Sequence, residues 1–170
     1  AGPVVAGAVV LPAEFFLKAA NRKVCSEMND SKQFPEDRRE ELYAVILSLA
    51  ERGELFWASG EASIEEIETE NIVGATCLAM KRAMDGASEK SKGLWSPEPK
   101  SEDDLFSTNG SSREDKSWVT QVDGRHMKKL PYEHTGLVKG DTISLSVAMG
   151  SLIAKVTRDR HMRALDEAYP

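Results

Sequence analysis

The sequence feature that most constrains the fold is a short run of β-branched and small residues, VVAGAVV, at Val4–Val10. The run is short for a helix and is followed by Pro12, so it predicts a buried β-strand. An amphipathic helix is predicted between Pro35 and Gly53, where apolar residues recur at helical spacing and acidic residues occupy the first turn. Strands that alternate with amphipathic helices indicate the α/β class.

The next part of the chain predicts a second strand and two helices. Residues 54–63 (ELFWASGEAS) are mixed and aromatic, which is typical of a strand. Ser63 and Glu66 form a capping box, which begins a short acidic helix over 64–69. A longer helix is predicted over 70–84, with a core face made of Ile72, Ala75, Ala79 and Met80.

Helical and strand periodicity stop at residues 85–117, where Ser, Gly, Pro and charged residues dominate. This composition predicts a long surface loop, either an insertion, which we favour, or a functional flap. Trp95 and Phe106 are the side chains available to anchor it. A strand over 118–124, a basic connector and a final helix from about Ser144 follow, so we expect one α/β domain with a mixed sheet.

The formal charge of −6 by itself argues against a nucleic-acid partner, but the charge is unevenly distributed. Residues 27–70 hold 13 acids and 4 bases, whereas residues 117–170 hold 8 bases and 6 acids. The acidic excess therefore lies outside the C-terminal third, which keeps the charge needed to face a polyanion.

The two cysteines, Cys25 and Cys77, are far apart and outside any CxxC pattern. Reduced, buried thiols in a cytoplasm-like compartment are therefore expected in place of a disulfide scaffold or a thiolate zinc site. No apolar run reaches the roughly 18–20 residues of a membrane span, and the apolar start lacks a basic n-region. We therefore expect neither a membrane segment nor a secretory signal.

Two carboxylates stand where α/β folds place functional groups. Asp123 ends a predicted strand, and Asp141 lies just before the final helix. Paired carboxylates offer hard oxygen ligands to Mg²⁺ or Mn²⁺, as metal-assisted phosphoryl transfer requires. The alternative is structural: Asp123-Gly124 as a turn and Asp141 as a helix N-cap.

Basic and small polar residues provide a second candidate site. Lys155 and Arg158 share one face of the final helix, which either meets a phosphate backbone or is a solvated surface. Asn29, Ser31 and Lys32 precede the 35–53 helix. Asp30 or Ser31 is expected to cap that helix, while the alternative offers Ser31 and Lys32 to a phosphate.

The order of the motifs resembles bacterial-type ribonuclease HII. MNDSKQF, ENIVGATCLAMKRAM, VDG, LVKGD and SLIAKVTRDRHMRALDEAYP occur in that family's order, over most of residues 1–84 and 118–170. The resemblance implies a ribonuclease H-like fold, with a central mixed sheet flanked by helices. It also implies divalent-metal hydrolysis of the RNA strand of RNA/DNA hybrids, including 5′ of single ribonucleotides embedded in duplex DNA.

The resemblance assigns roles to seven residues of this chain. Asp123 and Asp141 match the third and fourth of four acidic ligands for Mg²⁺ or Mn²⁺. Residues near the substrate backbone are matched by Asn29, Ser31, Lys32, Lys155 and Arg158. The expected partner is an RNA/DNA hybrid or a DNA duplex with an embedded ribonucleotide. The protein is expected to be a cytoplasmic monomer that does not contact a membrane. Location in an organelle is the alternative if a transit peptide precedes Ala1.

The sequence also departs from the family pattern. The family's first two acids, an Asp-Glu pair before a Gly-Arg-Gly turn, precede the segment that matches Ala1. The chain stops at Pro170, short of a His-Lys-Gly-Tyr stretch, and the loop at 85–117 is longer than usual. We therefore interpret residues 1–170 as one ribonuclease H-like domain truncated at both ends, and we expect the isolated chain to be inactive.

Two other functions remain open from the sequence. A non-catalytic nucleic-acid-binding remnant combines the missing acids with the basic final helix. An interaction domain that uses the 85–117 loop is supported by the composition of that loop alone.

Overall fold

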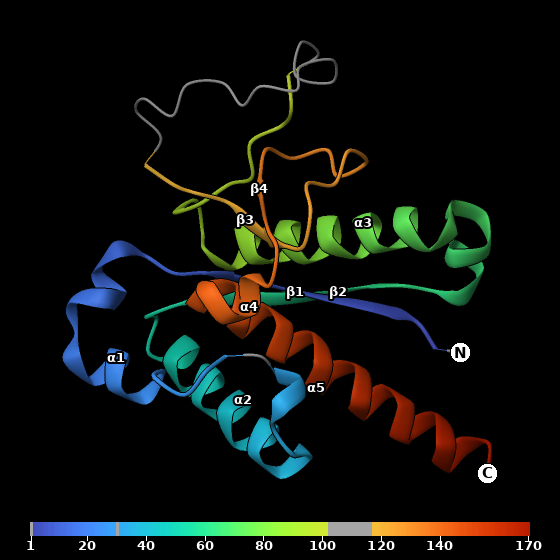
Figure 1. The fold of residues 1–170 in the computed structure, drawn as a ribbon, viewed down its shortest axis with the longest axis horizontal. Helices are drawn as coiled ribbons and strands as arrows, with labels where there is room; N and C mark the ends of the chain where they lie inside the picture. Colours follow the sequence, from blue (N-terminus) through green and yellow to red (C-terminus); the bar gives the residue numbers. More distant parts are fainter. Residues whose placement is uncertain (1, 30, 102–116) are drawn as a thin grey trace.

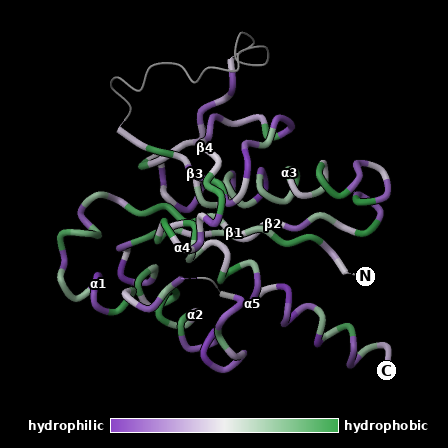
Figure 2. The backbone as a smooth tube through the Cα atoms, in the orientation of Figure 1, coloured by the Kyte–Doolittle hydropathy of each residue, from purple (hydrophilic) through white to green (hydrophobic). Residues whose placement is uncertain are grey.

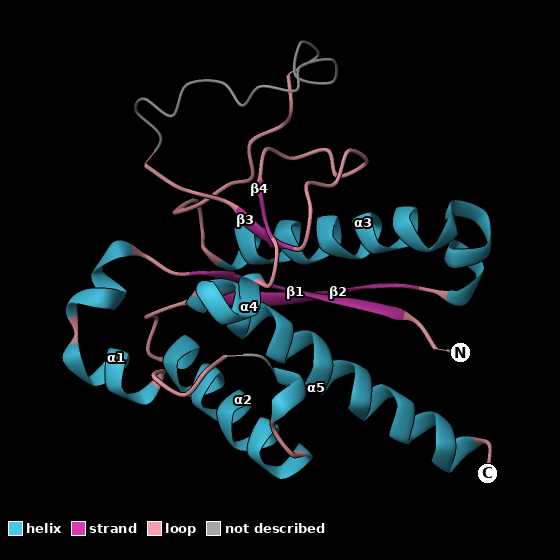
Figure 3. Cartoon of the chain, viewed as in Figure 1, coloured by secondary structure: helices cyan, strands magenta, loops and turns pink. Residues whose placement is uncertain are grey.

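The computed structural model describes residues 2–29, 31–101 and 117–170. Its centre is an antiparallel pair of strands, β1 (Val4–Val10) and β2 (Phe56–Ala62), in the register Val4↔Ala62 to Val10↔Phe56. The pair confirms both predicted strands. Helix α3 (Ile64–Lys90) covers one face of the pair, while α2 (Glu36–Glu51) and α5 (Leu145–Ala168) lie on the other (Figures 1 and 3).

Glycines bring β1 and β2 close to the helices on both faces. A Cβ on Gly7 of β1 would lie 2.2 Å from the backbone oxygen of Gly150 in α5. A Cβ on Gly60 of β2 would lie 2.2 Å from the backbone oxygen of Ala79 in α3. Larger side chains at these two positions would force the helices away from the strands.

Helix α2 agrees with the prediction from periodicity. It begins at Glu36 and buries Leu42, Tyr43, Ile46 and Leu49 against the core shared with α5. Its N-cap residue is Pro35, without a side-chain cap, so the expected cap from Asp30 or Ser31 is wrong. Ser31–Gln33 instead form a separate 3₁₀ turn, η2, and Asp30 lies outside the described residues.

Helix α3 confirms the capping box and corrects its continuation. Ser63 accepts a hydrogen bond from the Glu66 backbone, and the Glu66 carboxylate accepts one from the Ser63 backbone. The helix kinks at Asn71, where φ is 59°, as the division into 64–69 and 70–84 anticipated. Ile72, placed in the predicted core face, is 57% exposed because the kink turns the first residues of the second segment outward; Ala75 and Ala79 are buried as predicted.

The region predicted as a loop at 85–117 begins later than expected. Residues 85–90 continue α3, because Ala87 faces the core. Trp95 is buried, as an anchor should be, and its carbonyl accepts hydrogen bonds from the hydroxyls of Ser88 and Ser91. Phe106 and the rest of 102–116 lie outside the described residues.

The C-terminal third holds a second small sheet. Strand β3 (Gln121–Asp123) is shorter than the predicted strand over 118–124 and pairs in parallel with β4 (Thr135–Leu137). Strand β4 lies in the segment that was predicted as a basic connector. The short helices η1 (Ala13–Leu17), α1 (Ala19–Val24) and α4 (Gly140–Ile143) were also not predicted. Helix α5 begins after Ser144, as expected, and its C-terminal half is mainly hydrophilic (Figure 2).

These elements confirm a mixed α/β structure. The described strands form two separate two-stranded sheets, so a single central mixed sheet is not observed. Cys25 and Cys77 are both buried free thiols, as predicted, and burial raises the pKa of Cys25 to about 11. In the described part of the chain, no helix has the length and apolar character needed to cross a membrane.

Candidate active site

The parallel pairing of β3 and β4 places Asp123 next to the turn that leads to Asp141. Asp123 is the last residue of β3, and its register partner is Leu137, which ends β4. The next turn leads into α4, where the Gly140 backbone N–H donates to Asp123 Oδ1 at 2.9 Å. Asp123 therefore contacts the backbone of the residue that directly precedes Asp141.

Gly140 permits this close approach. A Cβ at this position would lie 3.1 Å from side-chain atoms of Leu137 and Val147 and 3.4 Å from Asp123 Oδ1. Lys139, just before it, adopts a left-handed conformation with φ of 56°. The Lys-Gly-Asp sequence thus forms a tight turn that presents an N–H group to the first carboxylate and positions the second.

The two carboxylates differ in their exposure. Asp123 is exposed, whereas only 9% of the surface of Asp141 is exposed to solvent. Asp141 also interacts with another group of the protein. The N-cap residue of α4 is Lys139, and Asp141 is the second helical residue, so Asp141 is not the N-cap. Asp123 does precede a turn, since Gly124 has φ of 89°, but its carboxylate also joins this turn to α4.

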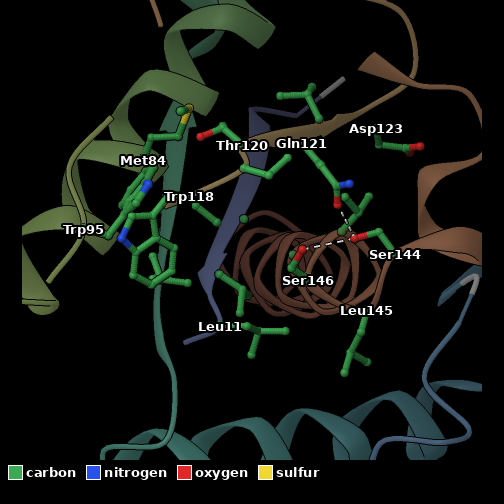
Figure 4. Close-up of a pocket in the computed structure, with 18 of the residues that line it drawn as sticks. Leu11, Met84, Trp95, Trp118, Thr120, Gln121, Asp123, Ser144, Leu145 and Ser146 are labelled. Carbon is green, nitrogen blue, oxygen red and sulfur yellow. Dashed lines mark hydrogen bonds between the residues drawn. The ribbon is translucent and has the colours of Figure 1, made fainter. Parts of the chain in front are cut away.

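A cavity of about 740 Å³ opens beside Asp123. Polar side chains from β3 and the start of α5 stand at this end of it (Figure 4). The hydroxyl of Ser144 donates to Gln121 Oε1 at 2.7 Å and lies 3.1 Å from the hydroxyl of Ser146. The sequence analysis did not predict this group.

The basic face of α5 is already engaged with an acid. Lys155 Nζ lies 2.8 Å from Asp159 Oδ1, and Arg39 of α2 contacts Asp159 Oδ2 at 3.0 Å. Burial alone would raise the pKa of Asp159, but Lys155 and Arg39 outweigh it and lower the pKa. Arg158, one turn from Lys155, is exposed.

The second group of predicted contacts lies beside the same helix. Turn η2 packs against α5, which brings Ser31 and Lys32 to the helix that carries Lys155 and Arg158. Lys32 is exposed and has an interaction partner, and Asn29 is exposed just before the turn. Ser31, Lys32, Lys155 and Arg158 therefore belong to two elements that are in contact.

Two further groups fix the connector between β3 and β4. The Tyr132 hydroxyl donates to Asp85 of α3, which also pairs with Lys81 at 2.7 Å. The rings of His126 and His134 stack with their centroids 4.3 Å apart. Burial is the main cause that lowers the pKa of both histidines, so both favour the neutral form.

Comparison with known proteins gives one consistent result. The chain is 37% identical over 171 residues to ribonuclease HII of Myxococcus xanthus (strain DK1622), covering 100% of the chain and 45% of that protein. It is 35% identical over 166 residues to ribonuclease HII of Ehrlichia canis (strain Jake), covering 98% of the chain and 64% of that protein. Ribonuclease HII of Caldanaerobacter subterraneus is 34% identical to it over 169 residues, covering 99% of the chain and 54% of that protein.

The chain is similar to ribonuclease HII over its whole length. It spans about half to two thirds of the length of the ribonucleases HII that it matches. No family model matches the chain. The similarity confirms the family resemblance inferred from the ordered motifs, which include the VDG and KGD segments.

Asp123 and Asp141 are of the residue type that the ribonuclease HII resemblance implies for a metal site, but they are fewer than the four acids that it implies. Carboxylate oxygens are the ligands that Mg²⁺ and Mn²⁺ prefer, and Asp123 accepts a hydrogen bond from Gly140, the residue before Asp141. Within residues 2–29, 31–101 and 117–170, no group of three or more His, Cys, Asp or Glu side chains is arranged to hold a metal ion. These two acids are half of the four that the resemblance implies.

Proposed function

We propose that this chain is part of a divalent-metal-dependent endonuclease that hydrolyses the RNA strand of RNA/DNA hybrids. Its substrates include duplex DNA with a single embedded ribonucleotide, cut on the 5′ side. The observation that carries the proposal is the similarity to ribonucleases HII along the whole chain. The turn that joins Asp123 to the residue before Asp141 supports it independently.

Asp123 and Asp141 are the residues proposed to hold Mg²⁺ or Mn²⁺. When bound, such a metal stabilises developing charge on a phosphoryl oxygen and lowers the pKa of a coordinated water. Gly140 fixes the Asp123 carboxylate through its N–H group, while the buried position of Asp141 restricts that side chain. With two acids in place of four, we expect the isolated chain to bind metal weakly and to lack turnover.

The helix α5 and the turn η2 are proposed to follow the nucleic-acid backbone. Lys155 and Arg158 supply cations from α5, while Asn29, Ser31 and Lys32 supply shorter polar groups from the adjacent segment. We further propose that the protein acts as a cytoplasmic monomer, away from membranes, and that the two small sheets belong to one central mixed sheet in a single ribonuclease H-like domain.

Cleavage of a defined duplex tests this proposal. The 170-residue chain and a longer form that carries the preceding Asp-Glu segment are each incubated with Mn²⁺ or Mg²⁺ and a DNA duplex containing one ribonucleotide. The longer form is expected to cut 5′ of the ribonucleotide, and Asp141→Asn to reduce the rate by at least about 100-fold, in line with the loss of a catalytic electrostatic group. Asp166→Asn, an exposed carboxylate on α5, is the matched control.

Cleavage that Asp141→Asn leaves unchanged would refute the assigned metal role. A longer form that binds the duplex without cutting it favours the second candidate, a non-catalytic nucleic-acid-binding remnant. That candidate is favoured by the basic residues of α5, Lys155 and Arg158, in a chain that carries two of the four acids that the resemblance implies. It predicts binding that weakens with salt, with a smaller salt dependence in Lys155→Ala.

A further inference from the structure

The connector between β3 and β4, residues 124–134, carries three exposed cations. Arg125, Lys128 and Lys129 all lie on the surface, and within the described part of the chain none of them forms an ion pair. Lys155 and Arg160 of α5 differ in this respect, because each contacts a carboxylate. A cation that has no acidic partner in the fold keeps its full charge for an external anion. The connector therefore presents three positive charges that the described residues do not pair.

Contacts of side chains and backbone hold the connector in one conformation. His134 bridges two of its backbone groups, since the Met127 N–H donates to Nε2 at 3.0 Å and Nδ1 lies 2.7 Å from the Tyr132 carbonyl oxygen. From outside the connector, Lys100 Nζ donates to the carbonyl oxygens of Met127 and Lys128 at 3.0 and 3.3 Å. A backbone fixed in this way loses little conformational entropy when its side chains bind a partner.

The first residues of the connector pack against β4, beside the candidate site. The Gly124 N–H donates to the Leu137 carbonyl oxygen at 2.8 Å. A Cβ on Gly136 of β4 would lie 2.6 Å from the carbonyl carbon of Arg125, so glycine is what permits this approach. The backbone of Arg125 is thereby held on β4, two positions after Asp123.

The rest of the connector lies on the α3 side of the molecule. The Tyr132 hydroxyl donates to Asp85 of α3, and Lys129 Nζ would lie 3.6 Å from a Cβ on Gly74 of the same helix. Helix α5 covers the other face of the central strands, as Figure 1 shows. The candidate acids are joined to both sides, because Asp123 precedes the connector and the helix α4, which holds Asp141, packs against α5.

We propose that Arg125, Lys128 and Lys129 form a second phosphate-contacting surface, which holds the duplex nucleic acid on the α3 side of the candidate active site. The inference rests on the proposed function, in which α5 and η2 contact the same duplex. The backbone from Arg125 to Lys129 spans at most roughly 14 Å. Phosphates of one strand follow each other every 3.4 Å or so along the duplex axis, so the three cations can reach neighbouring phosphates. Such contacts orient a duplex without reading its bases.

Binding of a dye-labelled RNA/DNA hybrid to the 170-residue chain tests this surface. Fluorescence anisotropy is measured over a salt series without divalent metal. The connector variant carries Arg125→Gln, Lys128→Gln and Lys129→Gln together. It is expected to bind at least about tenfold more weakly at low salt, and to lower the slope of log affinity against log salt by about 1 to 3, because each phosphate contact adds roughly 0.9 to that slope. A DNA duplex is expected to show the same losses.

A matched control removes the same charge from other places on the surface. It carries Lys23→Gln, Lys90→Gln and Lys92→Gln, at exposed positions of α1 and the end of α3. The control and the connector variant have equal net charge, so a difference between them reports where the charge lies. The control is expected to change the affinity by less than about twofold. Far-ultraviolet circular dichroism and urea unfolding check that both variants are folded.

Lysine acetylation read by mass spectrometry locates the bound duplex without any variant. A saturating amount of the hybrid is expected to protect Lys128 and Lys129 from acetylation and to leave Lys23 and Lys92 as reactive as in the free chain. Protection of all four lysines alike would indicate diffuse attraction and contradict a defined surface.

The proposal is overturned if the connector variant and the control bind equally well, or if the parent chain does not bind the hybrid. It is also overturned if polyglutamate binds as tightly as the hybrid, which would assign the surface to an acidic polypeptide. These measurements record no cleavage, so they are independent of the metal-dependent reaction. Cleavage of the embedded ribonucleotide by the longer form, with normal binding by the connector variant, would retain the proposed function and refute this surface.

Discussion

Replacement of Asp123 separates the structural role of its carboxylate from its proposed metal-binding role. Asp123 Oδ1 accepts the N–H of Gly140 at 2.9 Å, and Gly140 is buried in the turn before Asp141. Asp123→Ala leaves that N–H without its side-chain acceptor, and an unsatisfied buried donor costs about 1–3 kcal/mol. Asp123→Asn retains a carbonyl oxygen in the same position, so its expected cost is less than about 1 kcal/mol.

Urea unfolding at pH 7 measures the first effect, and calorimetric titration with Mn²⁺ measures the second. We expect Asp123→Ala to lose both stability and metal affinity, whereas Asp123→Asn loses mainly metal affinity because it removes the negative charge. Asp166→Ala, at an exposed position of α5, controls for the loss of any one carboxylate. An Asp123→Ala variant within about 0.5 kcal/mol of the parent, or equal losses for Asn and Ala, would refute this reasoning.

Three further outcomes test packing and electrostatics. Gly7→Ala should lose about 1–3 kcal/mol in urea unfolding because its Cβ meets a backbone oxygen of α5 at 2.2 Å, whereas Gly2→Ala, which meets only a flexible methionine side chain, should lose much less; equal losses contradict the close approach. Burial lowers the pKa of His134 below 6.5, so the unfolded chain takes up a proton before the folded chain does, and the free energy of unfolding should fall as the pH drops through 6.5. His134→Gln should make this pH dependence weaker in a pH series of urea midpoints. Arg82 lowers the pKa of Glu66 from 4.5 to about 2, so the stabilisation of the fold by this ion pair is present above pH 4.5 and is lost as the pH falls toward 2. Arg82→Met should remove this pH dependence from the midpoint of thermal unfolding. An unchanged pH dependence would exclude the ion pair as its source.

The elements that the sequence predicted are those whose signals are local. The β1 run and the capping box of α3 each depend on a few neighbouring residues, and the structure places both where expected. Helix α2 has its predicted extent because apolar spacing and Pro35 act within one segment. Propensity and punctuation suffice where no distant contact competes with them.

The errors occurred where distant contacts decide the structure. Strand β4 has three residues and exists because β3 offers it a parallel partner, which no local pattern records. Residues 85–90 are polar by composition, but burial of Ala87 keeps them helical. Ile72 follows the kink at Asn71, so the helical phase assumed across residues 70–84 did not apply to it.

The candidate site shows the same division. Residue types and motif order predict Asp123 and Asp141 as site residues, but the link between Asp123 and the residue before Asp141 is a hydrogen bond to Gly140 that depends on the pairing of β3 with β4. Local sequence also could not indicate that Lys155 shares Asp159 with Arg39, because Arg39 comes from a helix more than one hundred residues away. The chemistry of a candidate site can thus be proposed from the sequence before its geometry is known.

The shared carboxylate of Asp159 bears on how a basic face can serve nucleic acid in a chain of net charge −6. Lys155 and Arg39 contact different oxygens of Asp159, so the carboxylate has two cationic partners. If Lys155 turns toward a phosphate, Arg39 still neutralises Asp159, and no partly buried carboxylate is left unpaired. Lys155 can therefore exchange one anion for another at a lower cost than an isolated ion pair would impose, so an acidic net charge does not by itself prevent this face from meeting a phosphate.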